Sequence, residues 1–395
     1  MKLLLVSNLY PTPTEPTRGI FVHQLARRLA CLAELTVVCP LPWFPDWALP
    51  GAARWRHFSG VPAEYTVDGI RVASPKYPLL PKVSENLHAS LMQATLAPAI
   101  ARLHDKHRFD VMNTQWLYPD GVASARIARR LRIPLVLTAL GSDVNVFSAE
   151  PRKWSQVMAS TRIAAAVTTV SQALAERLAA AGVPREKLVA ILNGADHERF
   201  RVRDRGACRR ELGLPEDGKA IVFVGRLVEI KGVDRLVDAA ARLAVTRAGF
   251  TVYLVGDGPL REPLLADIRA RGLDSRVKWM GSRPHEQVAT WMGAADVFCL
   301  PSLNEGCPNV VLEALFSGRP VVASRVGGIP EMVSEANGLL PPGGDAEALA
   351  AALAQALDRT WDAQALRRGV MHLTWEAAAA GYHRVFASAS RPFAS

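Results

Sequence analysis

Four charged side chains in the second half of the chain have the types and spacing to hold a ligand rich in hydroxyl and phosphate groups. Glu305 and Glu313 stand eight residues apart, and a carboxylate can accept hydrogen bonds from two neighbouring hydroxyls at once. Arg226 and Lys231 lie in a second segment, and two fixed cations can hold a diphosphate and stabilise its charge when it leaves. The pattern therefore predicts a site for group transfer from a diphosphate.

The segments around the acidic pair have a strand, loop and helix pattern. Val297–Leu300 is an apolar run that predicts a buried strand, and helical spacing begins near Pro308. Gly306 lets the backbone approach a ligand closely, and Pro308 suits a first helical turn. A helix that begins there directs free N–H groups at an anion, so we expect this stretch to bind the ligand through Gly306, Cys307, Pro308, Asn309 and Val310. The alternative is that the glutamates are ordinary residues of an exposed helix face.

The basic pair falls between a predicted strand, Ala220–Val224, and a predicted helix, Val233–Ala244. This is the carboxyl edge of the strand, where open α/β sheets bind ligands. The alternative is that Arg226 and Lys231 are two surface cations.

Alternating strands and helices fill the whole chain and predict an α/β fold with parallel sheets. The strands expected in the first half are Leu3–Ser7, Leu35–Cys39, Val111–Thr114, Leu135–Ala139, Ala166–Val170 and Leu188–Leu192. Those of the second half are Ala220–Val224, Val252–Val255, Val277–Met280, Val297–Leu300 and Val321–Ala323. The helices expected between and after them are Ile20–Leu32, Glu85–His107, Ser171–Ala181, Val233–Ala244, Pro259–Arg271, His285–Met292, Val310–Phe316, Asp345–Leu357 and Trp375–Ala389.

The length of 395 residues predicts two domains, because single domains usually span roughly 100–200 residues. We place the boundary near residue 195, with residues 1–195 as one domain and 196–374 as the other. The charged stretch Glu198–Arg210 is the expected linker. Ser171 is the expected N-cap of its helix.

Charge is distributed unequally. Residues 1–195 hold 22 Lys and Arg against 13 Asp and Glu, whereas residues 196–395 hold 25 against 24. This asymmetry favours an anionic partner for the first domain, such as a membrane surface or a lipid-linked phosphate. An Arg-rich solvated surface without a partner explains the count equally well. A nucleic acid is disfavoured because no RNA- or DNA-binding motif accompanies the basic half.

The chain has no apolar run long enough to predict a membrane span or a signal peptide. Its five cysteines are widely scattered and form no C-x-x-C motif. This pattern favours the reducing cytoplasm as the location of the protein. The stretch Pro40–Gly60 is dense in tryptophan and proline. Such a loop can line a binding site or touch a membrane interface, or it can cap a core.

The second half resembles the retaining glycosyltransferases of family 4, whose two-domain architecture is called GT-B. The family's two glutamates match Glu305 and Glu313, and its G-R-x-x-x-x-K-G loop matches Gly225-Arg226 with Lys231-Gly232. Further family motifs in the expected order are Gly256-Asp257-Gly258-Pro259, Gly281-Ser282-Arg283 and Gly327-Gly328-Ile329-Pro330-Glu331. In the first half, Arg18-Gly19-Ile20-Phe21 resembles the loop near the donor phosphates, and Asn193-Gly194-Ala195-Asp196 resembles the hinge.

The resemblance implies two Rossmann-like domains with a cleft between them and transfer of a sugar from a nucleoside-diphosphate donor with retention of configuration. The second domain would bind the donor and the first the acceptor, and the last helix, at about 375–390, would cross back to the first domain. Glu305, Arg226, Lys231 and Asp143 are the expected catalytic residues. The expected donor-binding residues are Gly19, Gly225, Gly256, Arg283, Gly306, Cys307, Pro308, Asn309, Val310 and Glu313. No metal or other cofactor is expected, because no D-x-D pair is present.

One residue departs from the family pattern. Many members carry His-Gly-x-Asp after the fifth strand, whereas this chain reads Leu140-Gly141-Ser142-Asp143. A leucine can neither hydrogen-bond a sugar nor act as a base. Asp143 is the first-half residue that we expect to face the cleft.

Three alternatives remain open on the sequence. A non-catalytic partner subunit that binds a nucleotide sugar would explain Leu140, and a sugar-nucleotide epimerase or a phosphorylase would share the fold. The expected acceptor is a glycan or a lipid-linked precursor in cell-surface glycan synthesis. Its pathway is exopolysaccharide, teichuronic-acid-like or lipopolysaccharide assembly, with the protein in the cytoplasm or on the inner face of the membrane.

Overall fold

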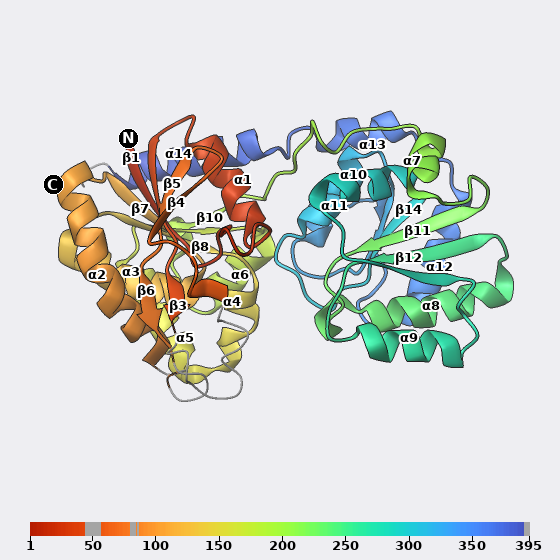
Figure 1. Ribbon diagram of the computed structural model, residues 1–395, viewed down its shortest axis with the longest axis horizontal. Coiled ribbons are helices and arrows are strands. Elements are labelled where there is room, and N and C mark those ends of the chain that lie inside the picture. Colours follow the sequence, from red (N-terminus) through yellow and green to blue (C-terminus); the bar gives the residue numbers. More distant parts are fainter. Residues whose placement is uncertain (44–56, 80–83, 85–86, 391–395) are drawn as a thin grey trace. The chain divides into compact units, whose positions relative to one another are not determined.

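The computed structural model describes residues 1–43, 57–79, 84 and 87–390. The chain divides into two units. Unit 1 consists of Met1–Leu192 with the C-terminal segment from Trp375, and unit 2 consists of Asn193–Thr374. Both are layered α/β structures with helices on either side of a mainly parallel sheet (Figure 1). The expected fold class is therefore confirmed.

The sheet of unit 1 has eight strands in the order β10-β9-β8-β7-β1-β2-β5-β4. Its strands are β1 (Lys2–Val6), β2 (Glu34–Val38), β4 (Glu64–Val67), β5 (Ile70–Ala73), β7 (Val111–Gln115), β8 (Leu135–Ala139), β9 (Ala166–Thr169) and β10 (Leu188–Ala190). Strands β7 and β8 are buried at every position, as expected where helices cover both faces of a parallel sheet. Strands β3 (Leu41–Trp43) and β6 (Lys76–Pro78) form a separate parallel pair.

The helices of unit 1 are α1 (Ile20–Leu29), α2 (His88–His107), α3 (Val122–Leu131), the short α4 (Ser142–Asn145), α5 (Pro151–Ile163), α6 (Gln172–Ala180) and α14 (Trp375–Ala389). The expected cap of α6 is confirmed, because the hydroxyl of Ser171 accepts a hydrogen bond from the backbone N–H of Leu174. Helix α14 was expected over the same residues, and its side chains join the core of unit 1.

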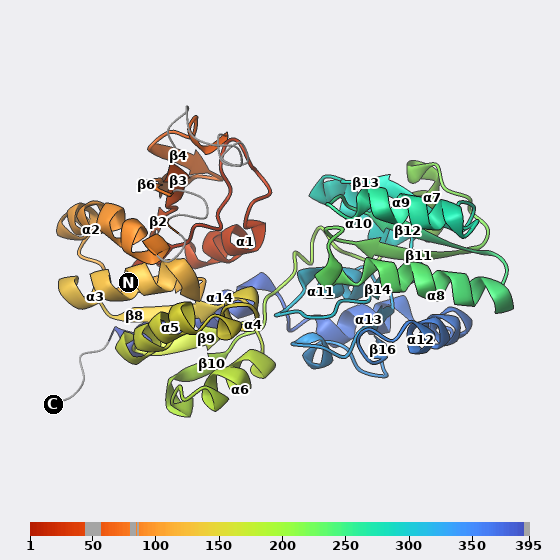
Figure 2. The ribbon, with the colours of Figure 1, turned by 90° about the horizontal axis from the view of Figure 1, so that it is seen from below.

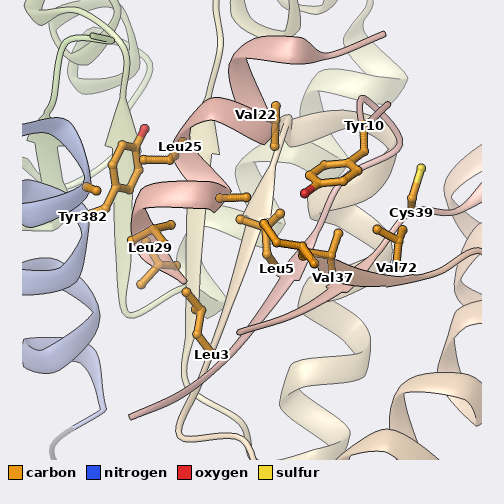
Figure 3. Packing of buried hydrophobic residues seen from close by; sticks show 14 of the residues in the cluster. Leu3, Leu5, Tyr10, Val22, Leu25, Leu29, Val37, Cys39, Val72 and Tyr382 are labelled. Atoms are coloured by element: carbon orange, nitrogen blue, oxygen red, sulfur yellow. The ribbon is translucent and has the colours of Figure 1, made fainter. Parts of the chain in front are cut away.

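Figure 3 shows that core. Leu3 and Leu5 of β1 and Val37 of β2 lie beneath α1, which contributes Val22, Leu25 and Leu29. Tyr382 of α14 packs beside α1, and Tyr382 is 1% exposed. Alternate residues of a strand point to opposite faces. The equally buried Leu4 and Val6 therefore point to the face of the sheet opposite α1. The last helix of the chain thus completes the core that the first strand begins.

Unit 2 contains a six-stranded parallel sheet in the order β13-β12-β11-β14-β15-β16. Its strands are β11 (Lys219–Val224), β12 (Phe250–Val255), β13 (Val277–Gly281), β14 (Val297–Leu300), β15 (Val321–Ala323) and β16 (Gly338–Leu339). Its helices are α7 (Arg205–Leu212), α8 (Val233–Thr246), α9 (Arg261–Ala270), α10 (His285–Ala294), α11 (Asn309–Phe316), α12 (Ala346–Asp358) and α13 (Ala363–Val370). Figure 2 shows the stacked layers of each unit from below.

One expectation about local structure is corrected, and another falls largely outside the described residues. The charged stretch Glu198–Arg210 is not a linker throughout, because its end belongs to α7. That helix forms because Asp204 caps its first turn through the N–H of Ala207, at 2.6 Å, and Gly213 ends it in the left-handed conformation. Of the aromatic stretch Pro40–Gly60, residues 44–56 lie outside the described ranges, and Trp43 at its start is 44% exposed.

The structure also adds elements that no expectation covered. Strands β4 and β5 form an antiparallel hairpin whose turn is Asp68-Gly69, and both turn residues have positive φ. Asp-Gly between two alternating runs is a strong hairpin signal, so this turn was readable from the sequence. Helices α3, α5 and α13 were missed as well.

Candidate active site

The residues expected to carry chemistry in unit 2 lie along one edge of its sheet. Because all six strands are parallel, the loops that follow them emerge at the same, carboxyl edge. Gly225–Gly232 follows β11, Gly256–Leu260 follows β12 and Ser282–Pro284 follows β13. The loop 301–308 follows β14 and leads into α11. A cavity of about 340 Å³, lined by Lys219, Phe250 and Arg276, lies at the opposite, amino edge and is remote from these residues.

Glu305 is bound by two donors. Lys231 Nζ lies 2.6 Å from Glu305 Oε1, and the hydroxyl of Ser302 donates to the same oxygen at 2.6 Å. The side chain of Glu305 is only 10% exposed, and that of Lys231 is 24% exposed. The fold therefore brings together two of the four expected catalytic residues, 74 positions apart in the chain, as a partly buried ion pair. Ser302 was not expected at the site.

Glu313 is positioned by a histidine that the sequence did not reveal. His285 Nε2 lies 3.0 Å from Glu313 Oε1, and His285 Nδ1 lies 2.7 Å from an Nη1 of Arg199. A guanidinium can only donate, so Nδ1 must accept and Nε2–H donates to the carboxylate. Glu313 is 7% exposed. Arg199, His285 and Glu313 thus form a chain of hydrogen bonds from α11 to α10 and to the segment before α7.

The start of α11 is built as expected for an anion site. Pro308 is the N-cap, with extended backbone and no side-chain cap, and the helix begins at Asn309. Asn309 and Val310 are partly exposed at its first turn, whereas Cys307 is buried. The side chain of Asn193 donates to Asn309 Oδ1 at 3.0 Å. The first N–H groups of the helix have no partner within the helix, which favours a negative charge there.

Two glycine positions explain why side chains are excluded from this edge. Gly256 has φ of 145°, and a Cβ there would overlap the carbonyl oxygen of Gly225. At Gly327, with φ of 53°, a Cβ would likewise overlap the carbonyl oxygen of Glu305. Any larger residue would push the loops apart, so both glycines set the spacing of the backbone around the acidic residues.

Arg226 and Arg283 are exposed at this edge. Neither guanidinium has a hydrogen bond or ion pair within the described ranges. Gly306 lies in the loop of Glu305, where its carbonyl accepts from the N–H of Gly328 at 3.0 Å. The structure thus places Arg226, Lys231, Glu305, Arg283 and the start of α11 on the same edge of unit 2.

In unit 1, Gly19 lies directly before α1, and a Cβ there would overlap the carbonyl oxygen of Leu9. The glycine is therefore required by the loop itself. His23 of α1 is buried, with Nδ1 2.7 Å from the hydroxyl oxygen of Tyr10 and Nε2 3.0 Å from Asp68 Oδ2.

The expectation for Asp143 is corrected. Its side chain is not presented to a ligand but is fully buried. Its oxygens accept hydrogen bonds from the backbone N–H groups of Leu117, at 2.9 Å, Leu140, at 3.0 Å, and Gly141, at 2.8 Å. Burial raises the pKa of Asp143 to about 6. Three backbone donors require an acceptor inside the fold, and the sequence pattern could not distinguish this use from contact with a ligand.

A second buried carboxylate was missed by the sequence reasoning. Asp120 is 0% exposed, and Asp120 Oδ1 accepts from the backbone N–H of Asn8 at 2.6 Å. Burial raises its pKa to about 7. Across the described part of the chain, no group of three His, Cys, Asp or Glu side chains is arranged to hold a metal ion.

Comparison with known proteins assigns both units. Residues 218–359 match the family described as Glycosyl transferases group 1, and residues 19–199 match Glycosyltransferase Family 4. A Bacillus subtilis protein named as a teichuronic acid biosynthesis glycosyltransferase is 30% identical over 364 residues, covering 89% of this chain and 88% of that protein. An Erwinia amylovora glycosyltransferase named for amylovoran biosynthesis is 30% identical over 65% of this chain and 64% of its own length.

Solved structures show the same architecture. HepE from Anabaena, in complex with UDP, superposes with a TM-score of 0.75 at 22% identity and covers 98% of this chain and 100% of its own. Sucrose-phosphate synthase from Thermosynechococcus elongatus gives a TM-score of 0.76 at 24% identity, with the same coverage. Both likenesses concern the fold. Together with the two family matches, they make the chain a member of glycosyltransferase family 4 with the GT-B fold.

Proposed function

We propose that the protein transfers a sugar, with retention of configuration, from a nucleoside-diphosphate sugar bound at the carboxyl edge of unit 2 to an acceptor bound at unit 1. The observation that carries this proposal is the pairing of Lys231 with Glu305 beside the open start of α11. It supplies cations and helix N–H groups for a diphosphate and carboxylates for sugar hydroxyls in one place. HepE, a structural neighbour solved with UDP and with UDP-glucose, supports a nucleotide sugar as the donor.

Each residue has a distinct role in this proposal. Glu313, oriented by His285, accepts hydrogen bonds from the ribose hydroxyls. Arg226, Lys231 and the first N–H groups of α11 stabilise the negative charge that develops on the departing diphosphate. Glu305 binds hydroxyls of the transferred sugar near the carbon that reacts. An oxygen of the departing phosphate takes the proton of the acceptor hydroxyl, so Leu140 removes no group that this route requires.

The acceptor belongs to cell-surface glycan synthesis in this proposal, because relatives named for teichuronic acid and amylovoran synthesis share most of the chain. It is a glycan or a lipid-linked precursor. Such acceptors are assembled on membranes, so we infer a cytoplasmic protein that associates with the inner membrane face. None of the helices in the described ranges combines the length and apolar character needed to cross a membrane.

Thermal unfolding across a panel of UDP, GDP, ADP and TDP sugars tests donor binding. One nucleotide sugar should raise Tm of the wild type, and Glu313→Ala and Lys231→Ala should abolish the shift. Glu335→Ala and Lys278→Ala are the matched controls, because both residues are exposed in unit 2 and lie outside the loops of the carboxyl edge; these variants should keep the shift. A wild type that no nucleotide stabilises contradicts the proposal.

Leu140 favours a second candidate, a non-catalytic subunit that binds a nucleotide sugar. Product analysis separates the candidates once the donor is known. Release of nucleoside diphosphate that depends on an acceptor extract identifies the transferase, and conversion of the donor without acceptor identifies an epimerase. Binding without any product identifies the non-catalytic subunit.

A further inference from the structure

The carboxyl edge of the unit 1 sheet contains a built feature whose purpose the proposed function does not explain. Strands β8, β7 and β1 are neighbours and run parallel, so the loops that follow them meet at one edge. These loops start at Leu140 after β8, at Trp116 after β7 and at Ser7 after β1.

Two buried carboxylates lock these three loops together. Asp143 ties the loop after β8, through Leu140 and Gly141, to the loop after β7, through Leu117. Asp120 ties the loop after β7 to the N–H of Asn8 in the loop after β1. Burying a carboxylate is costly unless its hydrogen bonds are made, so the chain commits two such groups to holding this edge in one conformation.

Trp116 begins the loop after β7, which both carboxylates connect to its neighbours. It has φ of 91° and ψ of 124°, a backbone conformation that is strained for a bulky residue. Its N–H donates to the carbonyl of Thr138 at 2.9 Å, and its carbonyl accepts from the N–H of Gly121 at 3.0 Å. Asp143 holds the next residue, Leu117. A glycine would adopt the same backbone without strain, so the tryptophan is present for its side chain.

Three polar side-chain atoms around this turn make no hydrogen bond to the described residues. Trp116 Nε1, Asn8 Oδ1 and Asp120 Oδ2 are buried and have no hydrogen-bond partner among the described residues. Buried polar atoms are normally satisfied. Each of these three atoms is closed off from solvent, so the part of this turn that a ligand can contact is the indole ring, which is only half-buried.

The chemistry of the indole selects its ligand. The flat apolar face of an indole suits the C–H face of a sugar ring. A phosphate group presents charged oxygens and has no apolar face to lie on the indole. A neutral sugar ring satisfies these requirements and a phosphate does not.

We propose that Trp116 is an acceptor-binding residue that stacks on a pyranose ring, with Asp120 and Asp143 holding the turn that positions the indole. This inference rests on the proposed function, because it names the chemical class of the acceptor. The acceptor then ends in a sugar, and the enzyme extends a saccharide that an earlier glycosyl transfer has begun.

The test is fluorine NMR of the full-length protein labelled with 5-fluorotryptophan. Trp116→Phe identifies the Trp116 resonance by its loss, and the resonance of the half-buried Trp154 in α5 is the internal reference. The probes are methyl glycosides of glucose, galactose and N-acetylglucosamine, added at concentrations on the order of 0.1 M to exceed a millimolar Kd. Mannitol, which has hydroxyls but no ring, and inorganic phosphate are the comparison probes.

We expect at least one glycoside to shift the Trp116 resonance while mannitol, phosphate and the Trp154 resonance show no change. A Trp116 resonance that no glycoside moves, or that phosphate moves as strongly, overturns the inference. Trp116→Gly provides a second readout, because glycine suits the backbone at this position. It should remain folded and keep the nucleotide-dependent Tm shift but lose glycoside binding, detected by saturation-transfer difference NMR of the glycoside.

The two proposals fail separately. A wild type stabilised by a nucleotide sugar whose Trp116 resonance ignores every glycoside refutes only the acceptor inference. A wild type that no nucleotide sugar stabilises refutes the donor site, whatever the Trp116 resonance shows.

Discussion

Lys231 and Ser302 share one oxygen of Glu305, so among the residues that the structure describes no side chain occupies the second carboxylate oxygen, which can bind a ligand. The pair is pre-organised in that Lys231 already lies at the carboxyl edge with its charge directed at the loop of Glu305. A group that is held in place before the reaction does not have to reorganise when charge develops on the substrate, so no reorganisation energy is lost. The same principle applies to Glu313, whose orientation depends on a neutral histidine.

At this scale we predict the effect of His285→Ala. Loss of the Nε2–H donor should free the carboxylate of Glu313 to rotate and should weaken donor binding roughly tenfold, equivalent to about 1.4 kcal/mol. Because the bond is remote from the transferred sugar in our proposal, the KM for the donor should rise while kcat changes little. Steady-state kinetics with varied donor checks this.

Gln287→Ala, an exposed position on the same helix, is the control and should match the wild type. A variant at His285 whose kcat falls with an unchanged KM would place that residue in the chemical step instead.

The sequence could predict these residues only where local spacing reveals them. Glu305, Glu313 and Lys231 belong to motifs with fixed distances along the chain, so they were found. His285 lies 28 positions from Glu313 and Ser302 bonds a side chain that it precedes by three residues; a lone serine or histidine has no spacing that marks it. Asp143 was found but assigned the wrong contact, because burial is a property of packing and not of the motif.

At the scale of elements, Asp120 and Asp143 join three loops at one edge of the unit 1 sheet. The same two carboxyls make the stability of unit 1 depend on pH. Both carboxyls are fully buried, and their pKa values are raised from 3.8 to about 7 for Asp120 and to about 6 for Asp143. A carboxyl that keeps its proton longer in the folded state than in the unfolded state lowers stability as pH rises.

We therefore predict that Asp120 makes unit 1 lose stability between about pH 4 and pH 7. The stabilising effect of its proton is fully present below the unfolded pKa of 3.8 and is lost as pH rises through the folded pKa of about 7. Asp120→Asn retains an oxygen for the N–H of Asn8 but cannot ionise, so its Tm should fall less over this range. Calorimetric scans at several pH values measure the difference.

Asp110→Asn, an exposed carboxylate of the same unit, should leave the slope as in the wild type. Parallel profiles for the wild type and Asp120→Asn would show that Asp120 does not titrate in this window.

The elements themselves were largely readable from the sequence. Strands β8, β14 and β15 and helix α14 have the expected bounds, because buried parallel strands are continuous apolar runs and α14 has regular helical spacing. Helix α3 was missed because it contains three arginines on one face and follows β7 after the irregular turn at Trp116. Helix α5 buries few of its apolar residues, with Val157 its one fully buried apolar side chain.

At the scale of the whole molecule, the positive charge of the first half gathers on packed helices. Helices α2, α3 and α5 of unit 1 lie side by side (Figure 2). Helices α3 and α5 contain no acidic residue. Their exposed basic side chains are Arg129, Arg130, Arg152 and Arg162. A surface of this kind attracts anionic lipid headgroups, at about 1 kcal/mol for each basic residue near the membrane.

We predict that Arg129→Glu combined with Arg130→Glu weakens binding to anionic vesicles roughly tenfold or more, since it reverses two charges on this face. The measurement is flotation with phosphatidylglycerol vesicles at low salt. Arg269→Glu combined with Lys278→Glu changes the net charge equally on exposed positions of unit 2 and should retain binding. If both double variants bind alike, only total charge matters, and if the wild type does not float at all, the membrane proposal is wrong.

The C-terminal helix has a consequence for how the protein is made. The chain leaves unit 1 after Leu192 and rejoins it at Trp375, and the strands of unit 1 depend on Tyr382 and Phe386 to cover their apolar face. During synthesis the ribosome therefore releases an unfinished first domain and must then produce the whole of the second before the missing helix emerges. The domain that begins first is completed last, and throughout that delay part of its apolar face stays uncovered.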